Sequence, residues 1–69
     1  MEKYNKFKYI IIDTTTHEVV MENSYRSIAD FINLIYPNDK ISHNAVGERL
    51  RTHKYFNYYD LLIKELLWI

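Results

Sequence analysis

Two amphipathic stretches, residues 24–35 and 42–53, constrain the fold most, because each begins at a serine and a proline separates them. Ser24 and Ser42 are residues that helix N-caps prefer, since their hydroxyls accept hydrogen bonds from the next turn. Pro37 ends the first stretch because the residue before a proline avoids the helical region. The pattern predicts two short helices joined by a turn. In the first stretch the apolar residues recur at helical spacing, at Ile28, Phe31, Ile32 and Ile35.

The second stretch predicts a helix with one apolar and one polar side. Ile41 precedes the serine and is expected to pack on Val46 as a hydrophobic staple. Glycine inside a helix costs about 1 kcal/mol of stability relative to alanine. Because Gly47 has no side chain, it could instead let another backbone or a ligand come close. At about 100° per residue, one side holds Ala45, Val46 and Leu50, and the opposite side holds Asn44, Gly47, Glu48 and Arg51, with Arg49 on the flank.

Residues 6–22 predict a β-hairpin that needs a cover. The first half of this segment is rich in β-branched and aromatic residues, which favours a strand. Asp13–His17 holds the Asp and Thr residues of a turn. Glu18–Glu22 then returns as a strand, with Val19 and Met21 expected to face inward. Because an isolated hairpin is barely stable in water, we expect a helix to cover its apolar side.

Residues 57–67 fit two different structures. As a helix, Asn57 would be the N-cap, and Asp60 would pair with Lys64 four residues later. As a strand, the segment would alternate in polarity and add to the hairpin. The residues alone leave both structures open. In the strand, one side would hold Tyr59, Leu61 and Ile63.

Composition narrows the class of protein. The chain has 69 residues, 48% of them apolar and none of them cysteine, which indicates one small domain over residues 1–69 and excludes disulfides and thiolate zinc sites. We expect a reducing, cytoplasmic location. The formal net charge is zero, which argues against coating DNA by charge alone but permits one basic face. No apolar run is long enough to span a membrane, and the first residues lack the apolar core of a signal peptide.

The residue types that catalysis needs do not form a site pattern. His17, His43 and His53 fall in different elements without ligand spacing, so no metal site is predicted. Asp13 and Glu18 flank a turn, where carboxylates more often cap backbone groups than transfer protons. The chain has no cysteine nucleophile and no glycine-rich phosphate loop. We therefore expect neither an enzyme nor a bound cofactor, and we assign no catalytic residue.

Short motifs run through residues 7–63 in a fixed order: Ile12-Asp13, Glu18-Val19, Ser24, Ile28-Ala29, Ile41-Ser42, Val46, Leu50 and Tyr58-Tyr59. This order resembles the small DNA-binding modules found beside phage and intron-encoded homing nucleases and in stand-alone phage proteins. In that group a hairpin leads to a serine-capped helix, then to a second helix, and then to a tyrosine-rich strand.

The resemblance implies an α+β fold of order ββααβ, in which the second helix of a helix-turn-helix pair enters a DNA groove. It favours a strand over residues 58–66, whereas local capping favours a helix there. Two features depart from the group. The turn over residues 37–41 is longer than a tight helix-turn-helix link, and Glu48 repels phosphate, although it can accept a hydrogen bond from cytosine. Carried over by position, Asn44, Glu48 and Arg51 face bases, and Arg49, His53 and Lys54 face phosphates.

Two functions follow from these patterns. The first is a small, phage-encoded DNA-binding regulator, expected to be a dimer because one short helix reads few base pairs. The second is a protein-binding module, such as a small phage-encoded inhibitor of a host or defence protein. Neutral charge, seven tyrosines and Glu48 favour it. A structural or assembly subunit is a third hypothesis. The apolar run over residues 66–69 is expected to dock on its own core or to form a homodimer contact.

Overall fold

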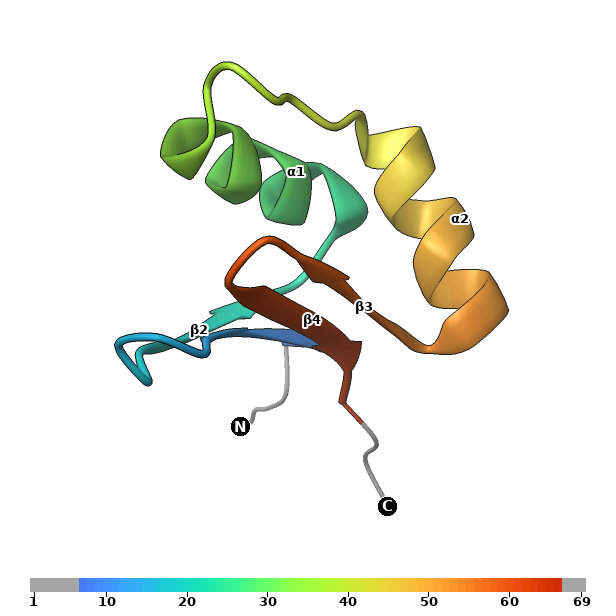
Figure 1. Cartoon of the computed structure of the whole chain (residues 1–69). Helices are drawn as coiled ribbons and strands as arrows, with labels where there is room; N and C mark the ends of the chain where they lie inside the picture. The colour runs from blue at the N-terminus through green and yellow to red at the C-terminus, as the bar shows by residue number, and fades with distance from the viewer. Residues whose placement is uncertain (1–6, 67–69) are drawn as a thin grey trace.

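The computed structural model describes residues 7–66 as a mixed α+β fold. Four strands form one antiparallel sheet in the order β2-β1-β4-β3. Both helices lie on the same side of this sheet, which leaves its other side without a helix (Figure 1). The predicted α+β class is confirmed. In chain order the elements are β1 (Tyr9–Asp13), β2 (Val19–Glu22), α1 (Tyr25–Ile35), α2 (His43–His53), β3 (Tyr55–Tyr58) and β4 (Leu61–Glu65).

The first hairpin forms as predicted, but its second strand faces the opposite way. The Asp13 carboxylate accepts hydrogen bonds from the backbone N–H groups of Thr15 (2.9 Å) and Thr16 (3.1 Å), which fixes the turn. The resulting register places Val20 opposite Ile11, on the side that the helices cover. The prediction that Val19 and Met21 face inward is therefore wrong: their side chains are 54% and 40% exposed. A register change of one residue turns every side chain of a strand to the other face.

The first predicted helix, residues 24–35, is confirmed as α1. The Ser24 hydroxyl accepts a hydrogen bond from the Ser27 N–H (3.1 Å), and the Ser27 hydroxyl oxygen accepts one from the Ser24 N–H (3.3 Å), which completes a capping box. The helix ends at Ile35, and its C-cap Tyr36 stands directly before Pro37. Its buried residues are Ile28, Ala29 and Ile32, whereas Ile35, also predicted to be buried, is 41% exposed.

The link between the helices is long but is held next to α2 and in its middle. Near α2, the Asn33 side chain donates to the carbonyl of Ile41 (2.9 Å) and accepts from its N–H (2.7 Å). In the middle of the link, Asp39 is held by two tyrosines, one at the end of β3 and one in the β3–β4 turn. The Tyr58 hydroxyl donates to the Asp39 carbonyl, and the Tyr59 hydroxyl donates to the Asp39 carboxylate (2.8 Å). A link that is longer than a tight helix-turn-helix turn therefore still fixes how α2 is placed relative to α1.

The C-terminal segment contains two strands, not the single element predicted for residues 57–67. β3 and β4 form a hairpin around Tyr59 and Asp60, and Tyr59 has a left-handed backbone with φ of 55°. The preference for strand over helix is confirmed, and β4 adds to the first hairpin by pairing with β1. The alternation of residues 59, 61 and 63 concealed the turn, because Tyr59 has a strand-forming side chain in a turn position. Residues 67–69, with their predicted docking or homodimer contact, lie outside the described residues.

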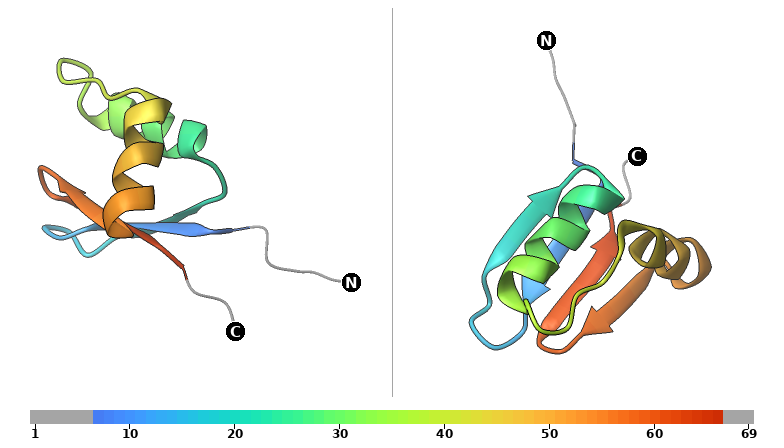
Figure 2. Two further views of the ribbon diagram at one scale, coloured as in Figure 1. Left: turned by 90° about the vertical axis from the view of Figure 1, so that its right-hand side faces the viewer. Right: turned by 90° about the horizontal axis from the view of Figure 1, so that it is seen from above.

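The two helices lie differently on the sheet. In Figure 2, α1 runs along β1 and β2, whereas α2 rises steeply from the sheet beside β3. The core lies between the helices and the sheet and contains no buried polar or charged residue within residues 7–66. Its fully buried side chains are Ile11, Ile28, Ile32, Val46, Leu50, Leu61 and Ile63.

Candidate nucleic-acid interface

The helix predicted over residues 42–53 is confirmed as α2, and only one side of it is buried. The Ser42 hydroxyl caps it by accepting a hydrogen bond from the Ala45 N–H (3.2 Å). Val46 and Leu50 pack into the core, and Ile41 is buried just before the cap. Because α2 stands at the edge of the fold, beyond β3, its opposite side faces away from the protein (Figure 2).

Gly47 belongs to the buried side of α2, which corrects its prediction as part of the polar side. A Cβ atom there would lie 2.7 Å from Cδ2 of Tyr25, in the first turn of α1. The ring of Tyr25 in turn packs on Tyr9 of β1, with ring centroids 5.4 Å apart. The close neighbour that this glycine admits is therefore a tyrosine ring of the same chain, and the contact sets the distance between the two helices.

The six residues predicted to bind nucleic acid are all exposed, but they do not form one compact face. The ridge of α2 that points away from the core runs through Glu48 and Thr52, whereas Ala45, predicted to be buried, is half-buried and packs against the core. Asn44 and Arg51 lie on the flank toward α1. The other flank, toward β3, holds Arg49 and His53, and Lys54 follows the end of the helix.

Thr52 is a residue of this surface that the sequence analysis missed. It lines a shallow hollow of about 410 Å³ together with Ala45, Glu48, Arg49 and His53. Thr52 follows Glu48 by four residues, and residues at that spacing share one side of a helix. Its place on this surface was therefore predictable from the sequence. Attention to charged residues alone left it out.

The cations of α2 differ in how firmly they are held. The Arg49 guanidinium lies over the ring of Phe56 on β3, 5.5 Å from the ring centroid. Arg51 lies beside Gly47, with Nη1 3.2 Å from where a Cβ would stand. Lys54 is the left-handed C-cap of α2, with φ of 69°, and its Nζ lies 3.9 Å from Oε1 of Glu65. Part of the Lys54 charge is therefore already compensated within the protein.

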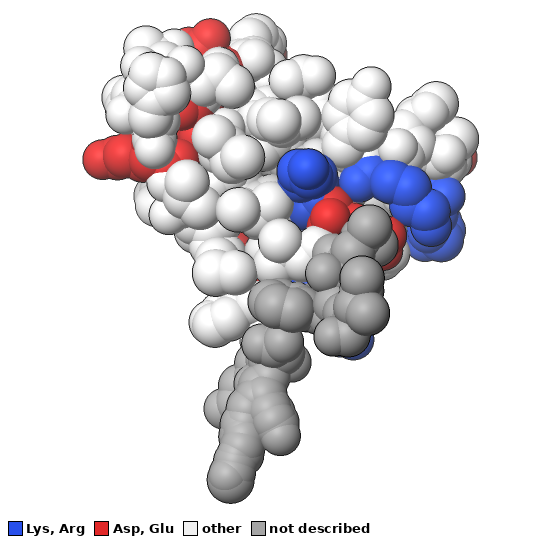
Figure 3. All heavy atoms as spheres, turned by 90° about the horizontal axis from the view of Figure 1, so that it is seen from below, with Lys and Arg blue, Asp and Glu red and all other residues white. Residues whose placement is uncertain are grey.

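Charge is distributed unevenly although the net charge is zero. Figure 3 views the sheet from its helix-free side, with α2 to the right as in Figure 1. Most Lys and Arg atoms in this view gather right of centre, with some Asp and Glu atoms beside them, and further Asp and Glu atoms form clusters at the left and upper edges. Glu48, on the ridge of α2, has no ion pair or hydrogen bond within residues 7–66. The α2 end of the molecule therefore combines several cations with one uncompensated carboxylate.

The described tyrosines pack mainly on one another. Tyr36 and Tyr59 lie 4.7 Å apart between ring centroids, and Tyr58 and Tyr59 lie 5.2 Å apart. The hydrogen bond to the Asp39 carboxylate raises the pKa of Tyr59. Burial raises the pKa of Tyr9 to about 12, with a smaller contribution from Tyr25. Rings this close leave no space for a stacked base between them, and the cluster fastens the link between the helices.

The remaining candidates for chemistry stay separate in space. Within residues 7–66, no three His, Cys, Asp or Glu side chains come close enough to hold a metal ion. The Asp13 carboxylate is used as the cap of the first turn. Neither helix of the described part is long and apolar enough to cross a membrane.

Comparison with family models, with curated proteins and with solved structures found no match for this chain. The resemblance to DNA-binding modules of phage and homing nucleases stays a prediction, and so does each residue role carried over from it.

Proposed function

We propose that this chain is a small DNA-binding regulator of helix-turn-helix type, with α2 entering a DNA groove. One observation carries the proposal: α2 projects at the edge of the fold with its outward side exposed and an arginine on each flank. A helix in the major groove lies between two phosphate backbones, so cations on both flanks suit that position. The capping by Ser42 and the burial of Val46 and Leu50 hold the helix in place for such contact.

The positions of the residues on α2 indicate which of them would contact bases and which would contact phosphates. Glu48 and Thr52, on the ridge, would meet base edges, where a carboxylate accepts from cytosine N4 and a hydroxyl suits several bases. Asn44 and Arg51 would meet bases or phosphate on the α1 side. Arg49, held on Phe56, would meet phosphate on the β3 side. His53 and Lys54 would extend that flank.

Few phosphate contacts are available, and this sets a numerical expectation. If Arg49, Arg51 and Lys54 each neutralise one phosphate, the logarithm of the binding constant should fall with the logarithm of salt concentration with a slope of roughly −3. Binding by one copy should therefore be weak. A second copy on an adjacent half-site would be needed for tight regulation.

The test is binding to mixed-sequence duplex DNA at 50 and 200 mM salt, measured by fluorescence anisotropy. The wild type should bind at micromolar protein and weaken with salt, and Arg49→Ala/Arg51→Ala should bind weakly with a slope closer to −1. Lys8→Ala/Lys64→Ala is the matched control, because it removes two cations from the helix-free side of the sheet. Absence of salt-sensitive binding by the wild type would exclude this function.

A protein-binding function, such as inhibition of a host or defence protein, is the second candidate. One observation favours it: the helix-free side of the sheet exposes apolar side chains, including Val19 and Met21. Contiguous exposed apolar patches often mark surfaces that bind other proteins. Capture of a partner from host lysate tests this candidate, and capture that Val19→Glu/Met21→Glu does not weaken would count against this surface.

A further inference from the structure

The helix-free side of the sheet is a continuous surface whose composition follows from the strand register. Two rows of side chains cross all four strands on this side. One row is Met21, Ile10, Lys64 and Tyr55, and the second is Val19, Ile12, Leu62 and Asn57. We call these eight residues, together with Lys8 at the start of β1, the open face.

The open face is apolar on its β2 side and mixed on its β3 side. Val19, Met21 and Tyr55 are 54%, 40% and 55% exposed, although side chains of these types are usually buried. Ile10, Ile12 and Leu62 are half-buried by their neighbours on the strands. Both helices lie on the other side, so no described element covers these residues (Figure 1).

The charges of the open face all have one sign. Lys8 and Lys64 are its two charged residues, and none of its described positions is acidic, although the whole chain has nine acidic residues. Glu22 stands at an alternate position of β2, on the helix-covered side, whereas Glu65 at the end of β4 lines a hollow beside Lys64 and pairs with Lys54. A partner for this face therefore needs apolar groups with negative charge beside them.

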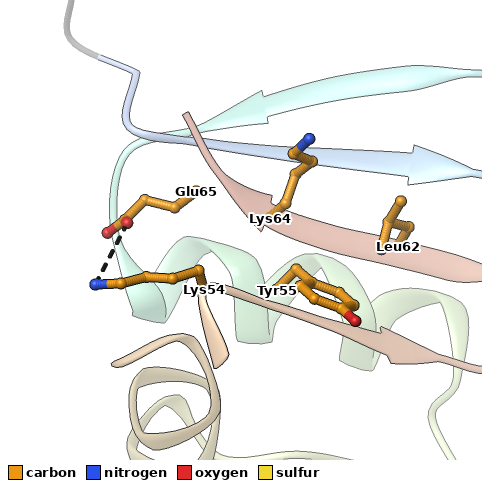
Figure 4. A pocket seen from close by; sticks show the side chains of 5 residues that line it. All are labelled: Lys54, Tyr55, Leu62, Lys64 and Glu65. Carbon is orange, nitrogen blue, oxygen red and sulfur yellow. Dashed lines mark ion pairs between the residues drawn. The ribbon is translucent and has the colours of Figure 1, made fainter. Parts of the chain in front are cut away.

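A hollow on the β3 side of the open face shows where such a charge would be received. It has a volume of about 530 Å³ and is lined by Lys54, Tyr55, Leu62, Lys64 and Glu65. Figure 4 shows Leu62 and Lys64 projecting from the same side of β4, with the Tyr55 ring on the neighbouring strand. Glu65 is paired with Lys54 at 3.9 Å, and among residues 7–66 no carboxylate forms an ion pair with the Lys64 ammonium of this hollow.

Other kinds of occupant fit this face less well. A second copy would bring its own Lys8 and Lys64, with Glu65 already paired with Lys54, so face-to-face pairing would put lysines of like charge together. An anionic membrane is usually recognised by clusters of roughly four to eight cations, more than this face holds. Single-stranded nucleic acid needs several aromatic rings for stacking, and Tyr55 is the one aromatic residue among the positions defined above.

We propose that the open face binds an apolar segment of a protein partner that carries carboxylates. The apolar side chains of the segment pack on Ile10, Ile12 and Met21, and a carboxylate meets Lys64. This inference names the partner chemistry of the protein-binding candidate and rests on that candidate. It is independent of DNA binding by α2.

The test uses the full chain as bait for a random library of twelve-residue peptides displayed on phage. Enriched peptides should combine apolar residues with Asp or Glu. The best peptide, synthesised with a fluorescent label, should bind Lys64→Glu about five- to tenfold more weakly, because reversal of one charge replaces attraction by repulsion. A peptide with its acidic residue changed to Lys should bind Lys64→Glu better than it binds the wild type. Circular dichroism confirms that each variant is folded.

Controls separate this inference from both proposed functions. Arg49→Ala/Arg51→Ala should bind the peptide as the wild type does, and removal of residues 67–69 should also leave binding unchanged. Enrichment of uncharged or basic peptides, or binding that Lys64→Glu does not weaken, would overturn the inference. So would a dimer that Val19→Glu dissociates, or peptide binding that appears only after residues 67–69 are removed. If Lys64→Glu still binds a partner captured from lysate normally, the proposed acidic and apolar partner is wrong, although the protein-binding function itself is supported.

Discussion

The outward side of α2 and the open face of the sheet are the two surfaces proposed to bind partners, and they differ in almost every property. The α2 surface is narrow, polar and charged, and it stands on a helix fixed by buried contacts at Val46, Gly47 and Leu50. The open face is flat and largely apolar, with two lysines. The first suits a charged groove and the second suits an apolar segment. Because they lie on different sides of the fold, variants can separate them.

The largest expected effect compares two adjacent residues of β4 that face opposite sides. Ile63→Ala should lower the free energy of unfolding by about 3 kcal/mol, because Ile63 is fully buried under the helices. Leu62→Ala, on the open face, should cost less than about 1 kcal/mol. Denaturant unfolding measures both. Equal losses would mean that the open face is covered within the chain itself.

Alkaline pH should destabilise the fold through Tyr9, which lies on the helix-covered side of the sheet. Burial raises the pKa of Tyr9 to about 12, so the folded protein keeps a proton that the unfolded chain loses near pH 10. Stability from this group is complete below pH ~10 and falls by about 1.4 kcal/mol per pH unit up to pH ~12. Unfolding measured across this range should show the fall, and Tyr9→Phe should reduce it. An unchanged slope in that variant would contradict the assignment.

The packing of α2 against α1 can be changed without changing the outward side of α2. Gly47→Ala should lower the free energy of unfolding by about 1–2 kcal/mol, because the new methyl group would meet the ring of Tyr25 at 2.7 Å. Alanine favours a helix by about 1 kcal/mol over glycine, so a purely helical effect would have the opposite sign. Thermal unfolding distinguishes the two signs. A comparison of Thr52→Ala with Thr52→Gly, at an exposed position of the same helix, is the matched control for propensity alone.

The smallest expected effect concerns the single carboxylate on the ridge of α2. Glu48→Gln should raise the affinity for duplex DNA by about two- to fivefold at low salt, because it removes repulsion from phosphate. The gain should shrink as salt increases, and peptide binding to the open face should not change. Anisotropy titrations with both ligands measure this. A loss of affinity for mixed-sequence DNA would contradict this prediction, because it would mean that a base contact of Glu48 outweighs its repulsion from phosphate.

Local signals predicted the helices well because their causes are local. Ser24 and Ser42 cap the helices at the predicted positions, and Pro37 stands where α1 has ended. The errors arose where the cause is not local. Which side of β2 is buried depends on the register that the Asp13 turn imposes. The turn at Tyr59 and Asp60 is stabilised by residues far away in the sequence, such as Asp39.

The candidate site was predictable in its residues and less so in their arrangement. Arg49 and Arg51 are two positions apart, which puts them on different flanks of a helix, but only the packing of α2 on Tyr25 and Phe56 shows what each flank touches. Gly47 was placed on the wrong side, because a residue without a side chain carries no polarity signal. The open face was missed entirely, since it follows from the strand register and from both helices lying on one side.

The strand order also has a consequence for how the chain reaches its native state. β1 is central in the sheet, yet its partner β4 is more than forty residues away, with Ile10 opposite Lys64. Pairings of this range demand closure of a long loop before they contribute, which slows folding. Until β4 is available, β1 has only β2 beside it, and the core residues under α1 stay open to solvent. We therefore expect folding to be all-or-none and to be completed only when β4 joins the sheet.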